Sequence, residues 1–254
     1  MILIKSNSQI NEMRKANQVV RDVLKLLQEH TREGISTWEL NKLAHEYIIS
    51  QNAIPSFLGY HGFPASVCIS VDCEVVHGIP SKKKILREGS IVSYDVGAIV
   101  NGWHGDAART VGVGYISNEC QQLINVTEEC FFKGVESIKP GITRLGDLGY
   151  TIQSHAESFG YGVVRDLVGH GIGRDMHEDP NVPNFGTPGR GIRLTAGMTI
   201  AIEPMINMGT EKVDFLSDGW TVKTEDRSLS SHYENTVALT SEGVVITTLI
   251  DKDF

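Results

Sequence analysis

The stretch IVSYDVGAIVNGWHGDAARTVG, residues 91–112, reads as two strands joined at Asn101-Gly102, a dipeptide typical of a two-residue hairpin turn. Such a turn places Asp95 opposite Ala108, so that Asp95 and Asp106 project from one face of the sheet as diagonal neighbours. Taken alone, the pair is also compatible with two surface aspartates on an ordinary hairpin. The stretch therefore predicts a β-hairpin that carries two carboxylates on one face.

Three more polar side chains interrupt apolar, strand-like segments further along the chain. Glu203 follows the apolar run 198–202, which is typical of a strand buried on both faces. Glu234 begins the strand-like segment ENTVAL and is equally compatible with a carboxylate on an edge strand. His170 lies between glycines that allow a close approach of the backbone, and it is as compatible with a structural role as with ligation.

Burying charged groups without partners is costly, so the five side chains need a common explanation. Two divalent cations carry four positive charges, and the four carboxylates supply four negative ones. Oxygen donors with one imidazole suit Mn, Fe(II), Co or Zn. Two such ions can hold a hydroxide between them and polarise a carbonyl, which is the chemistry of hydrolysis. We therefore expect a dinuclear metal centre built from Asp95, Asp106, His170, Glu203 and Glu234.

The rest of the chain alternates between helical and strand-like segments. Apolar spacing predicts a helix between Ser8 and Gly34, and a capping box at Ser36 predicts the start of a second helix. The segment 170–197 is rich in Gly and Pro, and we expect an irregular loop there, bordering a pocket. Further predicted helices span 117–138 and 145–159, and further predicted strands lie near 66–76, 163–169, 198–205, 232–240 and 243–250.

A short repeat suggests a duplicated architecture. Gly34-Ile35-Ser36 resembles Gly141-Ile142-Thr143, and each triplet follows one amphipathic helix and precedes another. A match this short also arises by chance. It favours one α+β domain, residues 1–254, with two similar halves at about 1–115 and 116–254 that face each other.

Composition excludes several classes of protein. A net charge of -8 over 254 residues argues against a broad nucleic-acid-binding surface. The first residues do not resemble a signal peptide, and no apolar run reaches the length of a membrane span. The four cysteines lack CxxC spacing, so we expect reduced thiols and a cytoplasmic protein.

At the same residues the sequence resembles type I methionine aminopeptidases. The resemblance covers almost the whole chain and is carried by five motifs in order: Asp95, HGDAART from His104, GHGIG around His170, IEP around Glu203 and HYENT around Glu234. It implies the pita-bread fold, an α+β architecture with two pseudo-symmetric halves, a central antiparallel sheet and helices outside.

The resemblance also implies a role for each site residue. Asp95 would chelate one metal, His170 and Glu203 the other, and Asp106 and Glu234 would bridge the two. The catalytic residues would be Glu203 as the general base, with His77 at the scissile amide and His177 at the carbonyl oxygen.

A pocket for the methionine side chain follows from the same resemblance. Without the resemblance, the residues of this pocket would be interpreted as ordinary core residues. Met176 stands where an aromatic residue is more usual, Phe63 lacks a more usual hydroxyl, and Asp72 stands where Asn is commoner. Aromatic rings and sulfur pack well against a thioether. With His61 at its rim, the substrate pocket is expected to comprise Phe57, Tyr60, Phe63, Cys68, Met176 and Trp220, beside His77 and His177.

The implied activity is removal of the N-terminal methionine from peptides and nascent proteins whose second residue is small. We expect a cytoplasmic monomer that meets its substrates near the ribosome and has no membrane or nucleic-acid partner. Prolidase and aminopeptidase P share the fold but resemble longer chains, and type II enzymes carry an insertion between His170 and Glu203, which are 33 positions apart here. A binding protein with this fold is the alternative outside enzymes, although all five ligand types are present.

Overall fold

The computed structural model describes residues 1–249 of the chain, and its centre is a nine-stranded antiparallel sheet. The sheet has the order β1-β4-β5-β14-β9-β7-β8, and β2 pairs with β4 while β15 pairs with β14. Its strands are β1 (Ile54–Pro55), β2 (Val67–Val71), β4 (Ile91–Val100), β5 (Trp103–Gly112), β7 (Gly169–Gly171), β8 (Glu178–Val182), β9 (Thr199–Ile202), β14 (Glu234–Thr240) and β15 (Gly243–Ile246).

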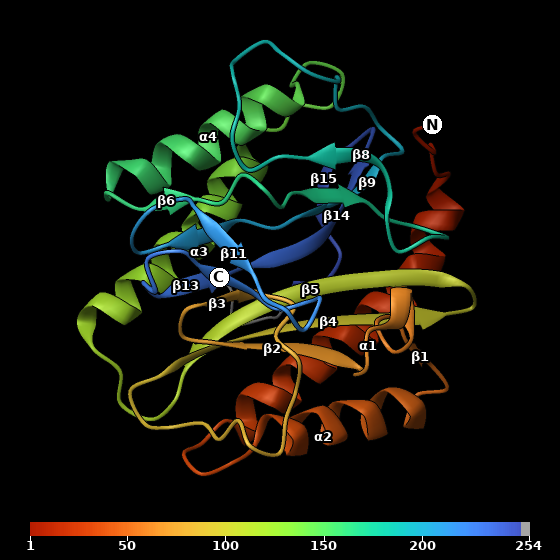
Figure 1. Ribbon diagram of the computed structural model, residues 1–254. Helices are drawn as coiled ribbons and strands as arrows, with labels where there is room; N and C mark the ends of the chain where they lie inside the picture. The colour runs from red at the N-terminus through yellow and green to blue at the C-terminus, as the bar shows by residue number, and fades with distance from the viewer. Residues whose placement is uncertain (250–254) are drawn as a thin grey trace.

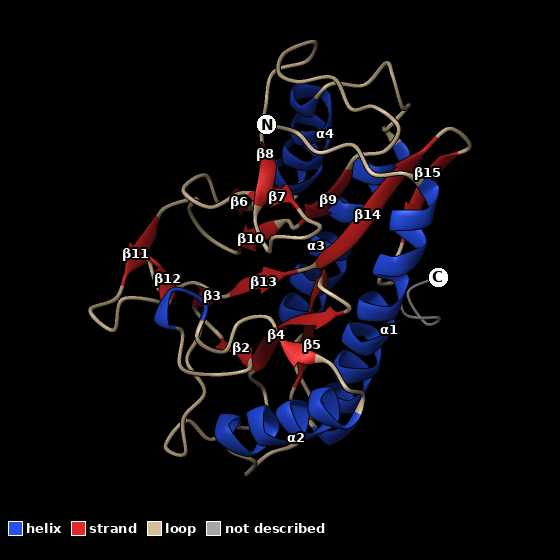
Figure 2. Cartoon of the chain, turned by 90° about the vertical axis from the view of Figure 1, so that its right-hand side faces the viewer, coloured by secondary structure: helices blue, strands red, loops and turns tan. Residues whose placement is uncertain are grey.

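Within the described residues, four α-helices surround this sheet. Three helices begin at a serine cap whose side chain accepts a backbone hydrogen bond, at Ser6, Ser36 and Ser117. The helices α2 and α4 lie at opposite ends of the molecule in both views (Figure 1, Figure 2). The four are α1 (Asn7–His30), α2 (Thr37–Ser50), α3 (Asn118–Glu136) and α4 (Leu145–Ser158).

Two hydrophobic clusters fill the space between helices and sheet. One contains Leu24 of α1, Leu40 of α2 and Tyr94 of β4, and the other contains Phe131 of α3 and Leu148 of α4 together with residues of β9 and β14. Burial of these large side chains supplies the main driving force for folding. The central sheet is therefore held between two separate helical layers.

Smaller elements complete the described part of the chain. One small sheet has the order β13-β10-β6 and the other β11-β12-β3, and a short 3-10 turn, η1 (Tyr60–Gly62), follows β1. Within residues 1–249 no helix is both long and apolar enough to cross a membrane. The strands are β3 (Glu74–Val76), β6 (Gly162–Val163), β10 (Met205–Asn207), β11 (Val213–Phe215), β12 (Val222–Thr224) and β13 (Ser230–His232).

The predicted hairpin register is confirmed. Asp95 pairs with Ala108 and Gly97 with Asp106, and Asn101 and Gly102 both have positive φ angles, 53° and 73°, as a two-residue turn with matching twist requires. Gly97 has a further role, because a Cβ there would lie 2.8 Å from the ring of Phe57. The register holds because the turn fixes it locally.

Other predicted boundaries need correction. The segment 170–197 is not wholly irregular, because β7 and β8 pair within it and extend the central sheet. The predicted strands 66–76, 198–205 and 232–240 each divide into two. The predicted strand 243–250 ends at Ile246, and its last residue lies outside the described residues. The strands β1, β11 and β12 were not predicted, because such short segments carry little periodicity.

The two repeated triplets occupy similar places in the structure. Gly34 and Gly141 have φ angles of 84° and 81°. The Gly34 N–H donates to the Leu86 carbonyl at 2.9 Å, and the Gly141 N–H donates to the Leu194 carbonyl at 2.7 Å. Each helix pair is thus tied to the following chain in the same way. The division of the domain into two halves stays a prediction.

Candidate active site

Neighbouring strands of the central sheet place three carboxylates on one face. Asp95 of β4 and Glu234 of β14 both lie directly opposite Ala108 of β5. Residues opposite one another in an antiparallel ladder project to the same side, and so does Asp106, two positions before Ala108. The small Ala108 side chain leaves the space between the three carboxylates open.

The next two strands bring the remaining pair of side chains. Glu203 follows β9, whose last residue, Ile202, pairs with Asn235, so Glu203 lies beside Glu234. His170 comes from β7, and its Nε2 atom lies 3.7 Å from Asp106 Oδ2 and 3.7 Å from Glu203 Oε1. The five side chains predicted to bind metal therefore converge from five adjacent parts of one sheet.

The carboxyl groups are held in an environment that disfavours their charge. Burial raises the pKa of Asp95 to about 7 and that of Glu203 to about 8. Burial, together with the neighbouring carboxylates, raises the pKa of Asp106 and Glu234 well above the ordinary range. Burial lowers the pKa of His170 to about 3. Without a compensating cation this cluster opposes its own ionisation.

Several buried ligand atoms have no hydrogen-bond partner within the described residues: Asp95 Oδ1, Asp106 Oδ1 and Glu234 Oε1. One ligand atom each from Asp106, His170 and Glu234 lies within 4.8 Å of the others. Buried polar atoms are almost always satisfied, so these need a partner that is not part of the chain. An oxygen-rich set with an imidazole fits a divalent metal ion.

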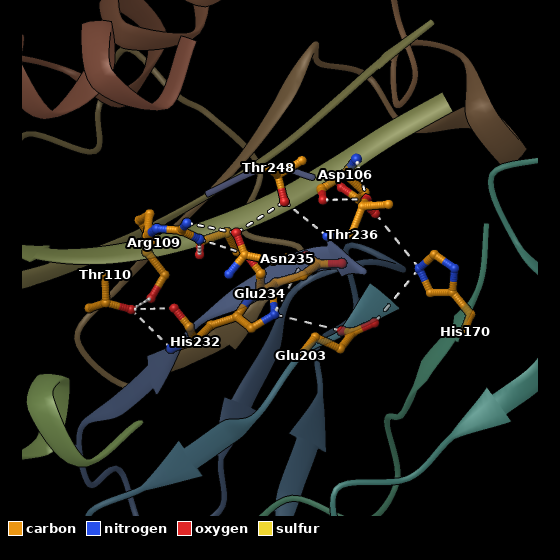
Figure 3. Close-up of polar contacts among 12 residues, drawn as sticks. Asp106, Arg109, Thr110, His170, Glu203, His232, Glu234, Asn235, Thr236 and Thr248 are labelled. Atoms are coloured by element: carbon orange, nitrogen blue, oxygen red, sulfur yellow. Dashed lines mark hydrogen bonds and ion pairs between the residues drawn. The ribbon is translucent and has the colours of Figure 1, made fainter. Parts of the chain in front are cut away.

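A second layer of hydrogen bonds fixes the backbone beneath the cluster (Figure 3). The buried Arg109 guanidinium donates to the Glu234 carbonyl at 2.6 Å and to Asn235 Oδ1 at 2.8 Å. The Thr236 hydroxyl accepts from the Asp106 N–H at 3.1 Å and donates to the Asp106 carbonyl at 2.9 Å. Such contacts hold the side chains that would bind metal in place before an ion binds.

A pocket of about 440 Å³ opens directly above the carboxylates. Phe63 and Trp220 meet edge to face, with ring centroids 5.1 Å apart. Every residue predicted for the methionine pocket or the metal centre lines this cavity: Phe57, Tyr60, His61, Phe63, Cys68, His77, Asp95, Asp106, His170, Met176, His177, Glu203, Trp220 and Glu234.

The two predicted catalytic histidines both line the pocket. His177 Nδ1 lies 2.7 Å from the Tyr60 hydroxyl, and its ring is 4.2 Å from that of His170, centroid to centroid. His77 occupies a left-handed backbone position, with φ at 58°, and burial lowers its pKa to about 4. Both imidazoles therefore face the space above the carboxylates in their neutral form.

The sequence and the fold match those of known proteins. The model of metallopeptidase family M24 matches residues 11–241. The chain belongs to this family. It is 55% identical over 251 residues to a methionine aminopeptidase of Clostridium acetobutylicum, covering 99% of this chain and all of that protein, and 46% identical to methionine aminopeptidase 1 of Bacillus subtilis, covering 98% and 100%.

Solved structures of M24 peptidases confirm the expected pita-bread fold. The methionine aminopeptidase of Rickettsia prowazekii superimposes with a TM-score of 0.96 at 44% identity, covering 98% of this chain and all of that one. The prolidase of Pyrococcus furiosus gives a TM-score of 0.79 at 24% identity, and this chain spans 66% of its length. The second match shows the shared fold alone.

The structure of this protein also shows pocket residues and contacts that the sequence did not reveal. Leu167, Val168 and Met205 line the pocket beside the predicted residues, and their apolar character gave no signal that separates them from core residues. Asp72 caps a left-handed turn, since its carboxylate accepts hydrogen bonds from the Ile91 N–H and the Ser90 hydroxyl, both at 3.1 Å. An acidic residue at this position therefore has a structural explanation.

Proposed function

We propose that this M24 metallopeptidase removes the N-terminal methionine from peptides and nascent proteins. The observation that carries the proposal is the direct contact between a carboxylate–imidazole cluster and a pocket walled by aromatic and sulfur side chains. The cluster suits hydrolysis at a divalent metal, and the walls suit a thioether. Relatives that are 43–55% identical over nearly the full chain and are named methionine aminopeptidases support it.

Two divalent ions are proposed at the cluster. Asp95 would hold one, His170 and Glu203 the other, and Asp106 and Glu234 would be shared, consistent with their unsatisfied buried oxygens. The donor set suits Co, Mn, Fe or Zn. When bound, such a pair activates water and polarises the scissile carbonyl.

The protein's own side chains supply proton transfer and orientation. Glu203 would take the proton of the attacking water and pass it to the leaving amine, because its carboxyl group lines the pocket beside the proposed metal ligands. His177 accepts the Tyr60 O–H at Nδ1 in this proposal, which leaves Nε2–H to donate to the carbonyl oxygen. His77, which also lines the pocket, would contact the scissile amide.

Substrate selection follows from the shape of the site. The closed apolar wall around Phe63, Met176 and Trp220 would enclose the methionine side chain, with His61 at the rim. Space beside the carboxylates would limit the second residue to a small one. We further propose that the enzyme acts in the cytoplasm, as a monomer, near ribosomes where nascent N-termini emerge.

The test compares two peptides after metal removal and reconstitution with single metals. We expect methionine release from Met-Ala-Ser, no cleavage of Ala-Pro-Ser, and loss of activity on chelation that returns with added metal. Cleavage of the proline peptide instead would assign the chain to the prolidase-like branch. Metal uptake without cleavage of either peptide would contradict the proposed activity.

A further inference from the structure

A histidine outside the predicted ligand set lies against the same cluster. His232, the last residue of β13 and two positions before Glu234, has a side chain that is 2% exposed. Neither of its ring nitrogens has a hydrogen-bond partner within the described residues. A buried imidazole without partners loses the free energy of its hydration, so a partner absent from the chain is expected.

The ring nitrogen of His232 faces two proposed ligands. His232 Nε2 lies 3.6 Å from Glu203 Oε2 and 3.9 Å from Glu234 Oε2, too far for hydrogen bonds. One ligand atom from each of these three residues falls within 4.8 Å of the others. Figure 3 shows the imidazole directed toward the Glu203 carboxylate from the side opposite His170. Glu203 thus presents Oε1 to one imidazole and Oε2 to the other.

The backbone holds this imidazole in place. The His232 N–H donates to the Thr110 hydroxyl oxygen at 2.9 Å, and the same hydroxyl donates to the His232 carbonyl at 2.9 Å. His232 also pairs with Met205 across β10. These contacts fix the backbone from which the imidazole projects, as the supporting contacts of a preorganised ligand do.

We propose that His232 is an additional nitrogen ligand for a divalent cation held by Glu203 and Glu234. This inference rests on the proposed metal centre and extends it from one imidazole to two. A second imidazole shifts the preference of an oxygen-rich site toward Zn, Co and Fe(II) and away from Mn and Mg. It also places an imidazole ligand on each side of the proposed general base, Glu203.

The experiment counts the histidines that bind metal in the full-length protein. Protein with ¹⁵N-labelled histidine is stripped of metal and titrated with zinc to saturation, and the Nε2 resonances are followed by NMR. We expect two histidines, His170 and His232, to show the shift of a metal-bound nitrogen. In His232→Gln one of these signals is lost, and zinc affinity measured by calorimetry falls at least as far as the ~10- to 100-fold typical of lost supporting residues.

His45→Gln is the matched control, because His45 lies on helix α2, where its ring bonds the Ser66 hydroxyl, and the change leaves the cluster intact. It should alter neither the two shifted signals nor the affinity. A single shifted histidine in the saturated wild type would overturn the inference, and so would weaker binding in His232→Gln with both shifted signals retained. The number of shifted histidines in the wild-type protein tests the inference even if His232→Gln fails to fold. If the wild type binds no zinc at all, the metal centre itself fails, which is a separate result.

Discussion

The floor and the wall of the pocket are both largely buried, yet they have opposite relations to stability. We call Asp95, Asp106, His170, Glu203 and Glu234 the floor, and Phe57, Phe63, Cys68, Met176 and Trp220 the wall. The wall residues pack against one another and stabilise the fold by themselves. The floor carboxyl groups repel one another and leave buried oxygens unsatisfied. Such a floor is retained for binding and chemistry, at a cost in stability.

The largest expected effect is that of a change at Glu203 on turnover, which should be separable from any effect on folding stability. Glu203→Gln keeps the shape of the side chain but removes the proposed base, so methionine release from Met-Ala-Ser should fall by about 10²- to 10⁴-fold. The melting temperature of the metal-free variant should stay level or rise, because a buried acid is replaced by a neutral amide. Steady-state kinetics and calorimetry measure the two quantities.

The control for this variant is Glu129→Gln, which makes the same change on the exposed side of α3, where Glu129 contacts His155. Its kinetics should match those of the wild type. Glu203→Gln with near-normal turnover would remove Glu203 from the mechanism. A large loss of stability in that variant would show that the floor stabilises the fold and is not retained at a cost in stability.

The next effect concerns pH and metal. The pKa of Asp95 and Glu203 is raised to about 7 and 8 in the folded protein, so their contribution to stability is complete below the ordinary value near 4 and is lost as pH rises through 7 to 8. The histidines act in the opposite sense. Burial lowers the pKa of His77 and His232 to about 4, so their contribution is lost only as pH falls below 6.5.

Between pH 6.5 and 8, therefore, the carboxyl groups dominate the change in stability, because unfolded histidines are already half neutral at pH 6.5. Metal-free protein should lose on the order of 1 kcal/mol per pH unit for each carboxyl that remains protonated in the folded state. Metal-loaded protein should show no such fall, since metal competes with protons for the same oxygens. Calorimetric melts at pH 6.5 and 8 with and without chelator measure this difference. Equal stability of the metal-free protein at both values would contradict the picture of a self-repelling floor.

How far the sequence predicts this site depends on how local the determining interactions are. The Asn101-Gly102 turn fixes the hairpin register within a few residues, so the diagonal placement of Asp95 and Asp106 could be predicted. The apolar run before Glu203 similarly marked a buried strand. The resemblance to a family, and not the residue pattern, supplied His77 and the wall.

What escaped prediction depends on contacts between distant segments. Gly171 lies in the segment expected to be an irregular loop, yet a Cβ there would lie 2.2 Å from the carbonyl oxygen of Asp179 in the adjoining strand β8, so it is a strand glycine that permits close packing. His232 has no sequence signal as a ligand, because only the fold brings it beside Glu203. The Tyr60–His177 contact joins residues 117 positions apart.

The contact between the Tyr60 hydroxyl and His177 predicts an effect of intermediate size on turnover, because this hydroxyl orients the proposed catalytic imidazole. Tyr60→Phe removes the hydroxyl that orients His177 but keeps the ring. We expect a roughly fivefold fall in kcat with little change in KM, as for the loss of one hydrogen bond of about 1 kcal/mol. Tyr47→Phe, which removes a hydroxyl bound to Asp22, is the control and should be silent. A change confined to KM would place Tyr60 with the wall alone.

The smallest effect tests the wall itself. Phe63 is 3% exposed and packs edge to face on Trp220, so Phe63→Leu loosens the surface that would hold the methionine side chain. KM for Met-Ala-Ser should rise a few-fold while kcat is retained, because the lost contact serves ground state and transition state alike. The cost in stability should be about 1 kcal/mol. Phe131→Leu removes a buried ring from the α3 core instead, so it should lower stability without raising KM. If both variants raise KM equally, the effect of Phe63 is general loosening of the fold, and the wall has no specific part in substrate recognition.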